Sequence, residues 1–85
     1  MSNEAIGAHL LEFAMQLDRE GDNLYRVRAY RHAGFEVNRI PRPLSEVYAQ
    51  SGRKGLEQLP GIGRSIAVTI ATMLTAGEGS TRKVA

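Results

Sequence analysis

A Pro-Gly-Ile-Gly turn between two helix-like segments restricts the fold of this chain more than any other feature. It lies within residues 56–70, Leu-Glu-Gln-Leu-Pro-Gly-Ile-Gly-Arg-Ser-Ile-Ala-Val-Thr-Ile. Pro60 ends the first segment because it has no N–H group and clashes with the preceding helical turn. Gly61 and Gly63 allow a positive φ and leave the backbone open to a partner. Apolar residues at helical spacing predict a helix on each side of the turn, the second beginning at Arg64: Leu56, Leu59, Ile66, Ala67 and Ile70.

The start of this second helix is suited to binding an anion. Its first N–H groups have no partner within the helix and carry the positive end of the helix dipole. Such groups bind phosphate oxygens, especially beside an exposed Gly-x-Gly turn. The pattern resembles the helix-hairpin-helix motif of sequence-nonspecific DNA-binding proteins, which implies DNA contacts by five residues: Gly61, Ile62, Gly63, Arg64 and Ser65. A tight turn between packed helices without a ligand is the alternative.

Length, charge and composition narrow the class of protein. A chain of 85 residues forms one small domain. It has no cysteine, which excludes disulfides and thiolate metal sites, and its two histidines are too far apart in sequence to suggest zinc. No apolar run is long enough to span a bilayer and no signal-peptide pattern is present. We therefore expect an intracellular, cytoplasmic or nucleoid-associated protein that is monomeric and has no membrane partner.

The charge is distributed unevenly along the chain. Residues 1–22 contain five acidic side chains and one basic side chain, whereas residues 23–85 contain ten basic and four acidic ones. A polyanion would therefore be attracted to the later part of the chain.

Apolar periodicity and capping residues predict an all-α fold, a compact bundle of about five short helices containing one helix-hairpin-helix motif. The bundle is expected to occupy residues 1–77, with a polar flexible tail at residues 78–85. The first helix begins at a Ser2 or Asn3 cap and ends before Gly21. The others are predicted at Leu24–Arg39, Leu44–Gln50, Arg53–Leu59 and Arg64–Ala76, with Gly77 closing the last.

The second predicted helix combines a core stripe with a basic surface. The stripe contains Val27, Tyr30, Ala33, Gly34 and Val37. Gly34 weakens a helix by about 1 kcal/mol relative to alanine, so its presence favours a close crossing with another helix. Arg26, Arg28 and Arg31, beside exposed tyrosines, would suit phosphate contact and base stacking. A solvated basic face without a ligand is an equally valid interpretation.

Residues 21–33, Gly-Asp-Asn-Leu-Tyr-Arg-Val-Arg-Ala-Tyr-Arg-His-Ala, resemble the second-helix signature of the N-terminal domain of family X DNA polymerases. The hairpin at residues 59–63 and a Leu-x-x-Gly end at residues 74–77 follow at similar distances, so the resemblance covers about residues 3–77. In that family the domain is a helical bundle that holds gapped or nicked DNA near a 5′ phosphate. The resemblance implies a DNA partner and a role in repair or replication. It also matches Arg26 and Tyr30 to a basic and an aromatic residue that face the 5′ phosphate.

The chain departs from this family where catalysis is concerned. In DNA polymerase beta and its closest relatives, a lysine after the hairpin attacks an abasic sugar to form a Schiff base. That lysine aligns with Thr69, and two further pocket lysines align with Ser65 and Glu57. The resemblance therefore predicts a non-enzymatic module, although a longer parent chain could carry a polymerase. Two alternatives stay open: an abasic-site lyase that uses Lys54 or the N-terminal amine, and a protein-interaction module.

The family's hairpin can also hold a monovalent cation through backbone carbonyls. The matching carbonyls are those of Glu57, Leu59 and Ile62, which would bind Na⁺ or K⁺. We expect no other cofactor.

Overall fold

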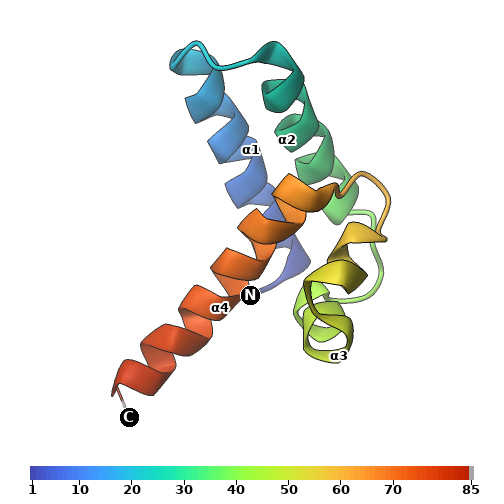
Figure 1. The fold of residues 1–85 in the computed structure, drawn as a ribbon, viewed down its shortest axis with the longest axis vertical. Coiled ribbons are helices and arrows are strands. Elements are labelled where there is room, and N and C mark those ends of the chain that lie inside the picture. Colours follow the sequence, from blue (N-terminus) through green and yellow to red (C-terminus); the bar gives the residue numbers. More distant parts are fainter. Residues whose placement is uncertain (85) are drawn as a thin grey trace.

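The chain folds into four α-helices, with no strand in residues 1–84 (Figure 1). The computed structural model describes the backbone of residues 1–84 and the side-chain surroundings of residues 1–76. The helices are α1 (Asn3–Arg19), α2 (Leu24–Val37), α3 (Leu44–Glu57) and α4 (Arg64–Val84). The predicted all-α class is confirmed.

The structure has four helices in residues 1–84 rather than about five, because the two helices expected on either side of residues 51–52 join as α3 across a kink. The expected interruption between them is present as that kink. Helix α3 covers both, and Gly52 lies inside it with φ 65° and ψ −163°. A glycine adopts this conformation without a steric penalty, so the chain bends at Gly52 and continues as a helix.

Two helix ends also differ from the sequence prediction. Helix α2 ends at Val37 and not at Arg39, and α4 continues past Gly77 to Val84. A glycine inside a helix costs only about 1 kcal/mol and is not an obligatory stop. The side chains of residues 77–85 lie outside the described part of the chain, so the proposed flexible tail stays a prediction.

Helices α1 and α2 form an antiparallel hairpin whose contact is unusually close (Figure 1). An ideal Cβ added to Gly7 would lie 2.8 Å from the carbonyl oxygen of Gly34. One added to Gly34 would lie 2.7 Å from Cγ of Leu11. The predicted close crossing at Gly34 is therefore confirmed.

Helix α1 packs mainly on α2, and α3 packs mainly on α4. Helix α4 crosses the α1–α2 pair (Figure 1), and all four helices contribute to one apolar core. The predicted stripe of α2 is buried in it together with the apolar side chains of α1, and Phe13 of α1 is partly buried beside them. The fully buried large side chains are Ile6, Leu10, Val27, Tyr30, Val37, Leu44, Leu56 and Ile70.

Asn3 joins the start of α1 to the segment that leads into α3. Its Oδ1 accepts a hydrogen bond from the N–H group of Leu44 at 2.7 Å. Its Nδ2 donates to the carbonyl oxygens of Ile40, at 3.1 Å, and Arg42, at 2.7 Å. One side chain from α1 thus caps α3 and fixes the loop between α2 and α3.

Within the described residues, no helix is both long enough and apolar enough to cross a membrane.

Candidate nucleic-acid interface

A groove of about 720 Å³ lies between the N-terminal half of α2 and the segment that joins α3 to α4. It brings together the two sequence motifs, which are separated by about thirty residues along the chain. Its lining from the α2 side is Asn23, Tyr25, Arg26, Arg28, Ala29, Tyr30 and His32. Its lining from the other side is Gly61, Gly63, Arg64, Ser65 and Ile66.

The turn between α3 and α4 is anchored from below by Ile62. This side chain is only 3% exposed and belongs to the apolar core. Its N–H group donates to the carbonyl oxygen of Leu59 at 3.1 Å, which closes the turn. Any contact of Ile62 with a ligand must therefore use its backbone.

The absence of a side chain has a different structural consequence at each of the two glycines of the turn. Gly61 has φ +77°, and a Cβ added there would lie 2.9 Å from Cγ of Glu36 on α2. Gly61 therefore allows the turn to pack against α2. Gly63 is not among the glycines with positive φ, and an added Cβ would meet nothing within 4 Å. Of the two glycines that allow a positive φ, Gly61 adopts one and Gly63 does not, and the bare Cα of Gly63 faces open space.

The first turn of α4 has free backbone donors. Its first helical hydrogen bond runs from the N–H group of Ala67 to the carbonyl oxygen of Gly63 at 2.9 Å. Among the described residues, no backbone acceptor pairs with the four preceding N–H groups, those of residues 63–66. Because these groups carry the positive end of the helix dipole, they are suited to binding an anion beside the groove.

Two unpaired guanidinium groups line the same groove. Arg28 and Arg64 are exposed, and neither has a carboxylate within 4.0 Å in the described part of the chain. Arg31 is also exposed and unpaired among these residues, but it lies outside the groove lining, on the outer face of α2. A phosphate in the groove would therefore meet backbone N–H groups and free cations together.

The sequence model of a family described as a helix-hairpin-helix domain matches residues 1–79. The chain belongs to the helix-hairpin-helix domain family. No curated protein and no solved structure matches the chain significantly. Membership in this family generally implies DNA binding without sequence specificity.

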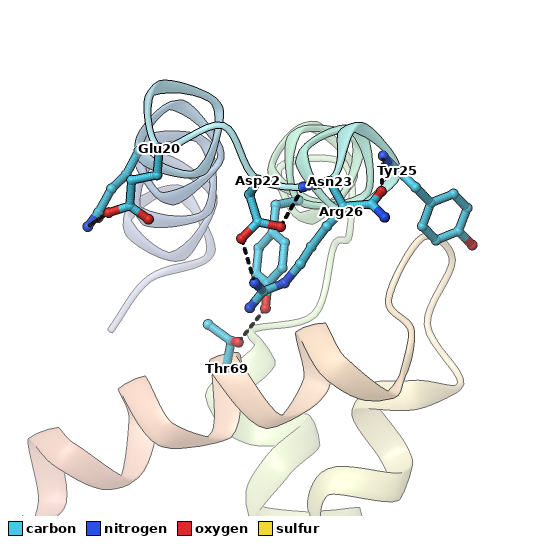
Figure 2. A network of polar contacts seen from close by, with 8 residues as sticks. Glu20, Asp22, Asn23, Tyr25, Arg26 and Thr69 are labelled. Atoms are coloured by element: carbon cyan, nitrogen blue, oxygen red, sulfur yellow. Dashed lines mark hydrogen bonds and ion pairs between the residues drawn. The ribbon is translucent and has the colours of Figure 1, made fainter.

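Arg26 is held within the helix-hairpin-helix domain by its own neighbours. Its Nη1 donates to Oδ2 of Asp22 at 3.1 Å, and its Cζ lies 5.9 Å from the centre of the Tyr30 ring (Figure 2). Asp22 is fixed in turn, because its Oδ1 accepts from the N–H group of Asn23 at 2.7 Å. Unlike Arg28 and Arg64, Arg26 therefore has an ionic partner within the protein.

Tyr30 forms the floor of the groove and belongs to the core. It is 2% exposed, and its ring meets Phe13 edge-on with centroids 4.8 Å apart. Its hydroxyl lies 2.8 Å from Oγ1 of Thr69, which donates to the carbonyl oxygen of Ser65 at 3.2 Å. Since Thr69 uses its single proton there, Tyr30 is the donor in the first bond. The core prediction for Tyr30 is confirmed, and its interpretation as an exposed stacking residue is wrong.

The exposed tyrosine of the groove is Tyr25, which the site prediction omitted. It is 83% exposed and points away from the Asp22–Arg26 pair (Figure 2). Its position outside the apolar stripe of α2 was the available signal. His32 was also missed; its Nε2 lies 3.6 Å from Oε1 of Glu36 beside the turn.

The positions that align with the family X lysines have different surroundings. Thr69 faces Tyr30 and Ser65 lines the groove, whereas Glu57 lies outside the lining with its Oε2 3.7 Å from Nε of Arg53. Lys54 is exposed and is not part of the groove lining. The N-terminal amine precedes α1, and Met1 is not part of the groove lining either.

The carbonyl groups proposed for a monovalent cation differ in their hydrogen bonding. The carbonyl oxygen of Leu59 accepts from Ile62, and no backbone N–H group of the described residues reaches those of Glu57 and Ile62. The described residues also contain no group of three or more His, Cys, Asp or Glu side chains that could hold a metal ion. Cation binding by these carbonyls stays a prediction.

Proposed function

We propose that this domain binds the phosphate backbone of DNA in the groove between α2 and the hairpin, without reading the base sequence. The observation that carries the proposal is the position of the four free N–H groups of residues 63–66 beside the unpaired Arg28 and Arg64. Backbone donors and guanidinium groups recognise phosphate, which is the same at every base pair. Such a role would take place in the cytoplasm or nucleoid, where DNA is found.

We further propose that the preferred DNA is gapped or nicked, with a 5′ phosphate in the groove, and that the domain serves repair or replication. This rests on the resemblance of residues 21–33 and 59–63 to family X DNA polymerases.

The direct test measures fluorescence anisotropy of a labelled gapped duplex with a 5′ phosphate, at several salt concentrations. We expect weak binding that falls steeply with salt, since few phosphates are contacted. Arg28→Gln and Arg64→Gln should each lower the slope of log affinity against log salt by about 1. Arg42→Gln is the matched control, because Arg42 contacts Gln50 and Glu46 outside the groove. Absence of binding at low salt, or equal losses in all three variants, would refute the proposal.

We also propose that the domain is not an enzyme. Schiff-base chemistry needs an amine, and position 69 holds a threonine whose hydroxyl is bonded to Tyr30 and Ser65. Borohydride trapping on DNA with a 5′ abasic site tests this. We expect no covalent adduct. An adduct that disappears in Lys54→Arg, or after the N-terminal amine is blocked, would instead identify a lyase with that amine as its nucleophile.

A further inference from the structure

The outer face of α2 carries a straight row of four exposed side chains, Leu24, Arg28, Arg31 and Phe35, which we call the outer row. They follow one another at intervals of four, three and four residues, so they lie on one line along the helix. Leu24 is 62% exposed and Phe35 is 58% exposed. The row thus has two free arginines in its middle and an apolar side chain at each end.

The two arginines of the outer row make an unpaired positive site. Arg28 and Arg31 are neighbours on the helix surface, and no carboxylate of the described residues lies within 4.0 Å of either. Glu36 is the acidic residue of α2, and it pairs with His32 and Arg39 on the side of the turn. Two adjacent cations repel each other, and an anion bound between them removes this repulsion.

The outer row is continuous with the groove. Arg28 belongs to both, since it also lines the groove opposite Gly63 and Arg64. A nucleic-acid strand that leaves the groove over Arg28 would therefore reach Arg31 and then Phe35. From residue 24 to residue 35 the helix rises about 16 Å, the length of about five stacked nucleotides.

We propose that the outer row is a binding site for single-stranded nucleic acid that continues from the hairpin groove. Arg28 and Arg31 hold consecutive phosphates, and the ring of Phe35 stacks on a base. Leu24 gives an apolar contact at the other end. This combination of cations and an exposed aromatic ring is how proteins bind single strands without sequence preference. The inference rests on the proposed function and extends it, because it selects DNA with an unpaired segment next to the bound phosphate.

The test compares two labelled DNAs, a nicked duplex and the same duplex with a gap of about five unpaired nucleotides, in the full chain. We expect wild-type protein to bind the gapped DNA more tightly. Phe35→Ala should lower affinity for gapped DNA about fivefold, the lower end of the range for base–aromatic stacking, and leave affinity for nicked DNA unchanged. Arg31→Gln should lower the salt slope by about 0.7 on gapped DNA only, as for one phosphate contact with a single strand.

Met15→Ala is the matched control, because Met15 is 57% exposed on α1 and lies outside the outer row. Thermal unfolding confirms that each variant is folded. Row variants that equal wild type on both DNAs would overturn the inference, while normal binding of nicked DNA would leave the proposed function intact. Equal losses on both DNAs would also overturn it. Failure of the wild-type protein to bind either DNA would refute both.

Discussion

The N-termini of α3 and α4 differ in how their first backbone N–H groups are satisfied. At α3, Oδ1 of Asn3 accepts from the N–H group of Leu44. Helices α1 and α2 are capped in the same manner, by Ser2 and Asn23. At α4 the capping position is occupied by Gly63, which has no side chain to offer. Donors that a side chain satisfies stabilise the fold, and donors left open are available to a ligand.

The largest effect is expected from removing the side chain that caps α3. Asn3→Ala removes three hydrogen bonds and should lower the free energy of unfolding by about 2–3 kcal/mol. Thermal unfolding followed by circular dichroism should show a fall in Tm of about 10 °C or more. Ser2→Ala, which removes one exposed cap bond, is the control and should cost about 1 kcal/mol. If Asn3→Ala loses DNA affinity at temperatures well below its Tm, then the N-terminus of α3 does not serve stability alone, and the contrast with α4 fails.

Adding a capping side chain at the N-terminus of α4 should have the next largest effect. Gly63→Asp supplies a cap in open space, so stability should change by only a few tenths of a kcal/mol. DNA affinity should fall at least about tenfold at low salt, because the carboxylate accepts from the free N–H groups and repels phosphate. Gly63→Ser caps without charge and should lose less. If Gly63→Asp binds DNA with the affinity of the wild-type protein in anisotropy titrations, the N-terminus of α4 is not part of the DNA site.

A substitution of Tyr30 tests whether its hydroxyl, at the floor of the groove, stabilises the fold or contacts DNA. Tyr30→Phe keeps the ring against Phe13 and removes the hydrogen bond to Thr69. We expect a loss of about 1 kcal/mol in the free energy of unfolding and no change in DNA affinity at any salt concentration. A lower affinity with an unchanged salt slope would mean that the hydroxyl, which is neutral, contacts phosphate after all.

The smallest effect is expected from opening the end of α2 beside the groove. Asn23→Gly frees the N–H group of Tyr25, to which Oδ1 of Asn23 is bonded at 2.7 Å. Replacing an asparagine cap by glycine costs only a few tenths of a kcal/mol. DNA affinity should stay within about threefold of wild type, on the stronger side, because one more donor faces the groove. A clear loss of affinity would show that Asn23 itself contacts DNA.

Local patterns in the sequence predicted the parts of the structure that depend on local physics. The apolar periodicity of α1 and α2, the close crossing at Gly34 and the turn at Pro60 all follow from residues within a few positions of each other. Contacts between distant residues could not be read in this way. The Tyr30–Thr69 bond joins residues 39 positions apart, and Asn3 caps a helix 41 positions away. Neither pairing leaves a periodic signal in the chain.

The same limit explains the errors at the glycines. A glycine marks permitted conformations and does not say which one the chain adopts. Gly77 lies within α4 and does not end it, Gly52 kinks α3, and Gly63 does not adopt the positive φ that it allows. At Gly63 the missing side chain leaves space for a ligand, which is a property of the surroundings and not of the residue alone.

The groove lies at the seam between two helical hairpins, since α1 packs mainly on α2 and α3 mainly on α4. Each hairpin can be expected to open as a separate cooperative unit in native-state hydrogen exchange. A DNA strand that contacts Arg28 on one hairpin and the free N–H groups of the other would join the two units. Bound DNA should then slow amide exchange in the core of both hairpins together, including amides far from any phosphate. The ligand would in this way stabilise each hairpin against opening separately from the other.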